Sequence, residues 1–234
     1  MHVDLDPRGG AGLRHARLPG PGAPGDAGPG DGLSDAGVVG GFTEVFLARH
    51  GETEWNRAGR RQGQLDAPLT PAGRAEVQRM ANALRGMPID AVFSSPLGRA
   101  RTTADVYAHT LGLAVVTVDE LAEIHHGSMA GLTDGETEVA FPGEMPRRAA
   151  DKYRWRFPDG ESYAEGDVRA AAALRRVGAT GAVRPLLVSH AMIGRMLLRN
   201  LLDLVPDEAL AYEQPHGTVY RVEMATKTAN EIRA

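Results

Sequence analysis

The 234-residue sequence has no cysteine, only two lysines and no excess of positive charge. Without cysteine, the chain can form neither disulfides nor thiolate metal sites, and no thiol can act as a nucleophile. The formal net charge of -4 argues against a general nucleic-acid-binding protein, which usually carries a basic excess. No apolar run is long enough to span a bilayer, and the N-terminus lacks the apolar block of a secretion signal. We therefore expect a cytoplasmic protein with neither nucleic acid nor membrane as a partner.

The first 41 residues differ in composition from the remainder. They contain 12 of the 29 glycines and five of the 15 prolines, and they contain no aromatic residue. Such a segment has too little apolar surface to offset the entropy lost on ordering. A disordered tail or a start codon assigned too far upstream would each give this composition. We expect the folded domain to comprise residues 42–234.

Strands and helices are predicted to alternate along that domain. Short apolar or alternating segments predict strands at 44–48, 91–93, 114–118, 185–189 and, as the last strand, 218–222. Helical spacing and capping residues predict helices over about 70–86, 97–111, 162–177 and 192–202. This order predicts an α/β fold, a three-layer sandwich with a mostly parallel central sheet flanked by helices. Residues 127–163 are less periodic and predict an irregular insertion with one or two short helices.

Polar clusters stand where three of these strands end. They are Arg49-His50, Ser94-Ser95 and Ser189-His190. Ligands of parallel α/β sheets bind beyond the carboxyl ends of the strands. We therefore expect the three clusters to converge on one edge of the sheet.

Arg49, His50 and Gly51 form the most informative triplet. A neutral imidazole can attack phosphorus if a hydrogen bond to its other ring nitrogen fixes the tautomer. A following glycine lets the backbone approach a phosphate closely, and arginine binds phosphate oxygens in bidentate fashion. The triplet alone could also arise by chance at a strand end.

The wider sequence resembles the signature of the histidine phosphatase superfamily, also called the phosphoglycerate mutase-like family. The resemblance lies in RHGETEWN at 49–56, QG at 62–63, LTPAGR at 69–74, SSPLGRARTTA at 94–104 and VSH at 188–190. The order and spacing hold over about residues 43–224. The resemblance implies a phosphoglycerate mutase-like fold of the architecture predicted above.

The resemblance also assigns site residues. It implies that His50 becomes phosphorylated, that Glu123 is the general acid and that His190 helps to hold the transferring group. It further implies phosphate contacts from Arg49, Asn56 and Arg99, and we expect Gln62 to contact the substrate. Two features depart from the family: Ala191 replaces a usual glycine, and residues 128–131 lack the usual aromatic and acidic side chains.

Other interpretations of single residues were weighed. Arg99 could be a helix-surface arginine, as we expect Arg101 to be. His125 and His126 could suggest a metal site, but adjacent residues of an extended chain point to opposite sides. The family chemistry needs no metal, and we expect neither metal nor cofactor.

The resemblance implies hydrolysis of a small phosphomonoester, but leaves two alternatives. The phosphate-binding residues would also serve a cofactor-dependent phosphoglycerate mutase, whose Arg, Tyr and Lys after the acid are absent here. A non-catalytic phospholigand-binding member is the other alternative. The substrate could be a sugar phosphate, another phosphorylated metabolite or a nucleotide.

A basic and aromatic cluster in the insertion is the candidate for substrate choice. It spans residues 147–156, in which Arg154 and Arg156 are expected to contact an anionic substrate. The alternative is a helix with solvated charges and Trp155 packed on the core. The apolar residues between 196 and 202 could serve either the core or a homodimer.

Overall fold

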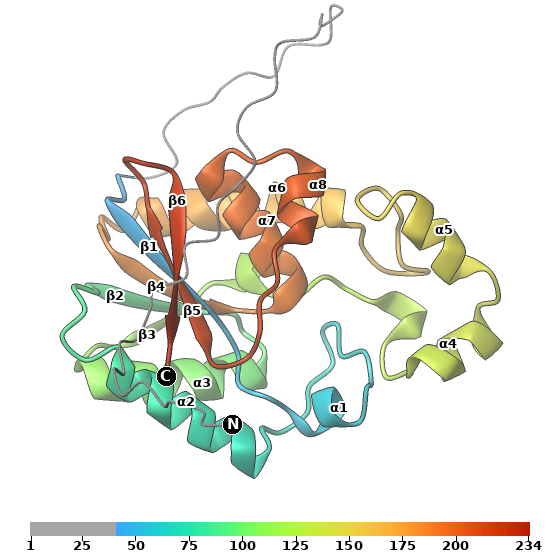
Figure 1. Ribbon diagram of the computed structural model, residues 1–234, viewed down its shortest axis with the longest axis horizontal. Helices are drawn as coiled ribbons and strands as arrows, with labels where there is room; N and C mark the ends of the chain where they lie inside the picture. The colour runs from blue at the N-terminus through green and yellow to red at the C-terminus, as the bar shows by residue number, and fades with distance from the viewer. Residues whose placement is uncertain (1–40) are drawn as a thin grey trace, which may run out of the picture. The chain divides into compact units, whose positions relative to one another are not determined.

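The computed structural model describes residues 41–234, and within them a six-stranded sheet forms the centre of the fold (Figure 1). The predicted tail lies, except for Gly41, outside the described residues. The strands are β1 (Glu44–Arg49), β2 (Ala91–Ser94), β3 (Val115–Thr117), β4 (Pro185–Ser189), β5 (Thr218–Glu223) and β6 (Thr228–Arg233). Their order is β3-β2-β4-β1-β5-β6, with the first four parallel and β5 and β6 antiparallel at one edge. The predicted mostly parallel sheet is thus confirmed.

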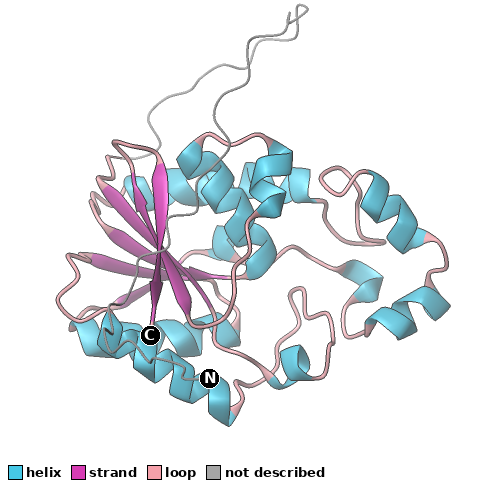
Figure 2. Ribbon diagram, in the orientation of Figure 1, coloured by secondary structure: helices cyan, strands magenta, loops and turns pink. Residues whose placement is uncertain are grey.

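Helices cover both faces of this sheet (Figure 2). They are α1 (Glu54–Arg57), α2 (Pro71–Ala83), α3 (Gly98–Leu111), α4 (Asp134–Ala140), α5 (Glu144–Ala150), α6 (Tyr163–Gly178), α7 (Ala191–Leu202) and α8 (Pro206–Ala211). Short 3₁₀ turns, η1 (Asp119–Leu121) and η2 (Gly127–Met129), interrupt the chain after β3. One buried cluster joins the sheet to α2 and α3, and a second joins its other face to α6 and α7. These two cores confirm the three-layer sandwich.

Local capping explains where the main helices begin. The Thr70 side chain accepts a hydrogen bond from Gly73 N at 2.8 Å, and Pro71 fits the first turn of α2. Ser162 begins α6 with a capping box, in which the Glu165 carboxylate bonds back to Ser162 N at 2.8 Å. Both starting points agree with the sequence prediction.

The insertion, residues 127–163, is here called the cap segment. It contains α4 and α5, which lie beside the sheet and away from α2 and α3 (Figure 1). Trp155 Nε1 donates to the Glu144 carboxylate at 3.0 Å, and the Trp155 ring packs edge-on against Phe157 with centroids 4.7 Å apart. Trp155 is therefore packed against the core, as the alternative interpretation held.

Residues 218–222 form a strand as predicted, within β5, but the expectation that this strand is the last one is wrong. β6 follows and pairs antiparallel with β5 along its whole length. Its sequence, TANEIR, is polar and mostly exposed, so it lacks the apolar pattern by which strands are recognised. Among residues 41–234, no helix is both long and apolar enough to cross a membrane.

Candidate active site

The three polar clusters meet at the carboxyl ends of adjacent parallel strands, as expected. Arg49 on β1 is in register with Ser189 on β4, and His50 N donates to Ser189 O at 3.0 Å. Ser95, directly after β2, donates its N–H to Val188 O at 3.0 Å. Strand pairing therefore brings segments that are far apart in the sequence to one edge of the sheet.

His50 is buried and held in one tautomer. Its Nδ1 lies 2.8 Å from Gly51 O, which can only accept, so Nδ1 carries the proton. Nε2 in turn accepts a hydrogen bond from Arg99 Nε at 3.2 Å. Burial, followed by the positive charges of Arg49 and Arg99, holds the pKa of His50 well below 6.5. The imidazole is therefore neutral at pH 7, with its lone pair on Nε2.

Arg99 is buried beside this nitrogen, so the helix-surface interpretation is wrong. Its guanidinium donates to Gly63 O at 2.6 Å and Leu65 O at 2.7 Å, and it pairs with Asp66 at 3.0 Å. These contacts hold the guanidinium against His50. Arg101, by contrast, is on the surface and pairs with an aspartate one turn further along α3.

Arg49 is the second arginine at the strand ends. One of its terminal nitrogens donates to Gln214 O at 3.0 Å, while its Nε has no partner among residues 41–234. Burial lowers the pKa of Arg49 to about 10, so the side chain is charged at neutral pH. Its Nε is therefore a buried donor whose hydrogen bond is not made within the described residues.

His190 lies next to His50, with ring centroids 5.1 Å apart. It is completely buried, and its Nε2 is 2.7 Å from Ser95 Oγ. Burial and the charge of Arg99 hold the pKa of His190 well below 6.5. In this state His190 is neutral, so a positive charge on it would require a bound anion to stabilise it.

A third histidine was not predicted. His216 precedes β5; its Nδ1 lies 2.8 Å from His50 O, and its ring centroid lies 5.5 Å from that of His50. Burial and the charge of Arg49 lower the pKa of His216 to about 4. A single histidine in a loop gives no sequence signal that it will reach the site.

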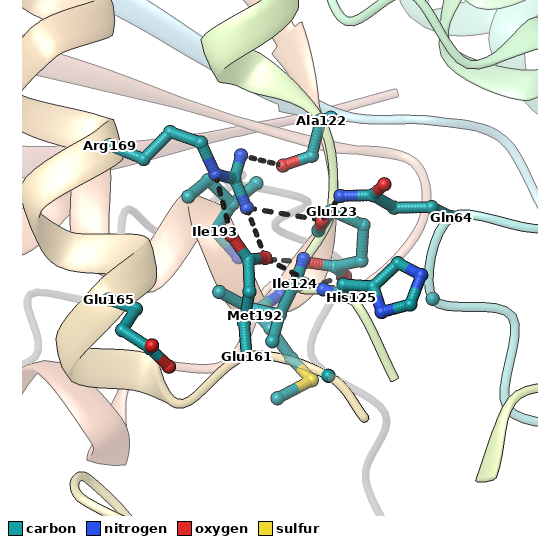
Figure 3. Close-up of polar contacts among 12 residues, drawn as sticks. Gln64, Ala122, Glu123, Ile124, His125, Glu161, Glu165, Arg169, Met192 and Ile193 are labelled. Atoms are coloured by element: carbon teal, nitrogen blue, oxygen red, sulfur yellow. Dashed lines mark hydrogen bonds and ion pairs between the residues drawn. The ribbon is translucent and has the colours of Figure 1, made fainter. Parts of the chain in front are cut away.

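Glu123 follows η1 and caps the start of α7 (Figure 3). Its Oε1 accepts from Ile124 N and Ile193 N, both at 2.9 Å, and its Oε2 accepts from Met192 N at 3.1 Å. Oε2 accepts only this one hydrogen bond among residues 41–234 and keeps a second lone pair for a proton. Burial lowers the pKa of both Arg49 and Arg99, and the negative charge of the nearby Glu123 partly offsets this shift. The role of Glu123 as general acid stays a prediction.

An arginine–glutamate pair holds the backbone around Glu123 (Figure 3). Arg169 on α6 donates to the carbonyl oxygens of Glu120 at 2.9 Å, Ala122 at 2.5 Å and Glu123 at 3.2 Å. It also pairs with Glu161 at 2.8 Å, and Glu161 accepts from the backbone N–H of His125 at 2.8 Å. The sequence did not reveal this network, because none of its members lies at a strand end.

Asn56 and Gln62 lie in the segment between β1 and α2. Asn56 Oδ1 accepts from Thr53 N at 3.1 Å in a capping box of α1, while its amide nitrogen has no partner among residues 41–234. Gln62 is buried, and its Oε1 also lacks a partner among those residues. Both can still offer polar atoms to a ligand, and their roles stay predictions.

Arg154 and Arg156 are not brought together with His50. Both are largely exposed; Arg154 pairs with Asp151 at 3.7 Å and Arg156 with Glu165 at 3.1 Å. Neither has a hydrogen bond or ion pair with Arg49, His50, Arg99 or His190. Their assignment to substrate binding stays a prediction.

His125 and His126 have different surroundings. His125 is exposed and accepts from Gly127 N at 3.2 Å, whereas His126 is buried and stacks on Phe157 with centroids 4.3 Å apart. His126 Nε2 lies 3.1 Å from Met192 Sδ. The two imidazole rings therefore do not face a common point at which both could bind one metal ion.

The structure explains one glycine and one departure from the family. A Cβ on Gly51 would lie 2.6 Å from Val77 Cγ2, so close packing on α2 also requires glycine there. Gly51 N donates a hydrogen bond to Thr103 Oγ1 at 3.1 Å.

Ala191 is the first residue of α7 and does not have a positive φ, so alanine replaces glycine without backbone strain.

Residues 45–233 match the model of the histidine phosphatase superfamily (branch 1), and the chain belongs to this family.

Its relatives include proteins named as mutases and as phosphatases. A Yersinia enterocolitica protein named "Probable phosphoglycerate mutase GpmB" is 39% identical over 167 residues, covering 70% of this chain and 76% of the relative. The mycobacterial glucosyl-3-phosphoglycerate phosphatase structure with VO3 has a TM-score of 0.71 and 25% identity, covering 81% of this chain and 96% of the other. The Bacillus stearothermophilus YhfR structure has a TM-score of 0.72 and 26% identity, covering 80% of this chain and 94% of the other.

Proposed function

We propose that this chain hydrolyses small phosphomonoesters through a phosphohistidine on His50, without a metal. The observation that carries the proposal is the state of His50: buried, neutral, with Nδ1 donating to Gly51 O and a lone pair on Nε2 beside Arg99. An imidazole in this tautomer is a nucleophile. The two arginines provide positive charge where the oxygens of a phosphoryl group need it.

The first step would be an in-line displacement. His50 Nε2 forms a bond to phosphorus while the bond from phosphorus to the leaving oxygen breaks. Arg99 Nε would exchange its contact with Nε2 for a phosphoryl oxygen, and the Nε of Arg49 offers a second donor. Glu123 would give its proton to the leaving oxygen.

The second step would release phosphate. Water attacks the phosphorus, the bond to Nε2 breaks, and Glu123 takes back the proton that the water loses. The enzyme is thereby restored with His50 neutral. His190, packed against His50, would bind a phosphoryl oxygen in both steps.

A leaving-group series tests the role of Glu123. Glu123→Gln should lower kcat strongly for an alkyl phosphate, which leaves as a poor alkoxide, and much less for p-nitrophenyl phosphate, which needs little protonation. Equal loss for both esters would show that Glu123 only caps α7.

Mutase activity is the second candidate, because a relative at 39% identity carries that name. Phosphorus NMR of purified protein with 3-phosphoglycerate separates the two reactions. Free phosphate should accumulate, with and without a chelator, and vanadate should inhibit its release. Conversion to 2-phosphoglycerate well above phosphate release would favour the mutase.

A further inference from the structure

The peptide group that joins His50 to Gly51 is held on both sides. Its carbonyl oxygen belongs to His50 and lies 2.8 Å from His216 Nδ1. Its N–H belongs to Gly51 and donates to Thr103 Oγ1 at 3.1 Å. Thr103 is itself held, because its hydroxyl donates to Arg99 O at 2.9 Å. A trans peptide group is planar and its two polar atoms point in opposite directions, so the two bonds together fix its orientation.

The orientation of this peptide group determines how the His50 ring is held. Gly51 O accepts from His50 Nδ1 at 2.8 Å, and this bond leaves the lone pair on Nε2, the atom that would attack phosphorus. Glycine populates more backbone conformations than any other residue, so the peptide group before Gly51 would turn readily if one of its two bonds were lost. Such a turn would move Gly51 O and release the imidazole from its direction.

The loop between α8 and β5, residues 212–217, presents His216 to the nucleophile. β5 pairs antiparallel with β1, so the residues that precede β5 run beside those that follow β1. Pro215 has a fixed φ, and Gly217 has a φ of +66°. A Cβ on Gly217 would also clash with the Glu76 carboxylate. His216 therefore stands between two residues that restrict the path of the loop.

The same loop contacts two other parts of the site. Gln214 O accepts from Arg49 at 3.0 Å, two residues before His216. The Gln214 side chain is buried against Gly194 in the first turn of α7, where a Cβ would clash with its amide. The loop thus holds the phosphate-site arginine, the nucleophile and the helix that follows His190.

His216 makes its contact as a neutral donor. A carbonyl oxygen can only accept, so the Nδ1 of His216 carries the proton. Burial, followed by the charge of Arg49, lowers the pKa of His216 to about 4, so the ring is uncharged at pH 7.

We propose that His216 is a positioning residue for phosphoryl transfer, whose Nδ1–H holds the His50–Gly51 peptide group and thereby directs the lone pair of His50 Nε2. An in-line displacement requires that lone pair to point at phosphorus. The inference rests on the proposed hydrolase and adds a residue that acts through the backbone of the nucleophile.

Two substitutions of His216 separate its donor from its ring. The amide nitrogen of asparagine stands as many bonds from Cα as histidine Nδ1, so His216→Asn can keep the donor while it removes the ring. His216→Phe keeps a ring 5.5 Å from that of His50 and removes the donor. His216→Phe should slow the phosphorylation of His50 by p-nitrophenyl phosphate, measured in a single turnover by quenching in alkali, by about 10- to 100-fold. His216→Asn should retain most of the rate.

Inhibition by inorganic phosphate provides a second readout. Its inhibition constant depends on Arg49 and Arg99, which both variants keep, and should change much less than the rate. His109→Phe is the matched control, since His109 is exposed in the last turn of α3 and its side chain has no hydrogen bond within residues 41–234. It should change neither value.

Thr103→Val removes the bond on the other side of the same peptide group and should also slow phosphorylation. It therefore guards against a folding defect in His216→Phe. A normal rate in His216→Phe, an equal loss in His216→Phe and His216→Asn, or a loss in His216→Asn alone would overturn the inference.

Nitrogen NMR of the imidazole rings distinguishes this inference from the proposed function. If no ester phosphorylates His50 in the wild type, the hydrolase proposal fails, but the His50 ring still reports its tautomer through one protonated and one unprotonated nitrogen. These two shifts should move toward each other in His216→Phe, as the bond to Gly51 O weakens, and not in His109→Phe. Unchanged shifts in His216→Phe would contradict the positioning role.

Discussion

Arg169 offers a quantitative test of how the site is held. Arg169→Ala would remove the donors to three backbone carbonyls and the ion-pair partner of Glu161. The Arg169 side chain is only 19% exposed, so solvent replaces these contacts poorly. Unpaired buried polar groups cost about 1–3 kcal/mol each and a broken buried pair about 3–5 kcal/mol. Because water reaches part of this pair, we expect the free energy of unfolding to fall by about 3 kcal/mol.

The same change should slow catalysis. Arg169 and Glu161 fix the backbone on both sides of Glu123 (Figure 3), and a displacement of about 1 Å can cost about 100-fold in rate. We expect kcat for an alkyl phosphate to fall by about that factor, with a smaller change in KM. Arg169→Lys keeps the charge but not the forked geometry, and should lie between the wild type and Arg169→Ala.

Arg176 on the same helix provides the control. It bonds to the Glu120 side chain at 3.2 Å, but 58% of its own side chain is exposed. Arg176→Ala should therefore change the free energy of unfolding by about 0–1 kcal/mol and leave kcat unchanged. Urea unfolding and steady-state kinetics on all three variants give the comparison. A stability for Arg169→Ala equal to that of Arg176→Ala, or a destabilised Arg169→Ala with normal kcat, would refute the reasoning.

Three further predictions follow from packing, burial and hydrogen bonding. Gly51→Ala should lower the free energy of unfolding by about 1–3 kcal/mol, because the added Cβ overpacks against α2. Gly135→Ala is the control, since open space surrounds that position and no such loss is expected. Equal urea midpoints for the two variants would contradict this. The pKa values of His126 and His216 lie at about 3 and 4, below the ordinary 6.5, so the unfolded chain binds more protons as pH falls. Urea unfolding at pH 7.5 and 5.5 should therefore show a loss of about 1.4 kcal/mol for each of these two histidines, in addition to the loss from His50 and His190, whose pKa is also lowered by burial. An unchanged free energy of unfolding would be inconsistent with the burial of these histidines. Ser95→Ala should lower both kcat and the free energy of unfolding, the latter by about 1–3 kcal/mol, because it removes the 2.7 Å partner of His190 Nε2. Normal values of both would argue against that contact.

The strand-end motifs were readable from the sequence because each is local. Arg49-His50 directly follows a buried apolar run, and parallel pairing places such ends together. Thr70 and Ser162 predicted the first residues of α2 and α6 for the same reason, because an N-cap residue and the residue it bonds to lie three positions apart in the sequence.

Tertiary contacts were not readable in this way. Arg169 reaches Glu123 across 46 residues, and His216 reaches His50 across 166. In the cap segment, the sequence drew attention to Arg154 and Arg156, which the fold turns outward and pairs with acids. Arg147 and Arg148 are adjacent on α5, and neighbouring helical residues point about 100° apart. Only the packing of α5 therefore decides that Arg147 is exposed and Arg148 half-buried.

Direct detection of the phosphorylated residue is the most decisive measurement. The protein would be mixed with a phosphomonoester, quenched in alkali within one turnover and digested for mass spectrometry, because phosphohistidine survives alkali but not acid. The account predicts one added phosphoryl group on the peptide that contains His50, absent in His50→Ala together with turnover. A phosphoryl group on another residue, or full hydrolysis by a folded His50→Ala variant, would contradict it.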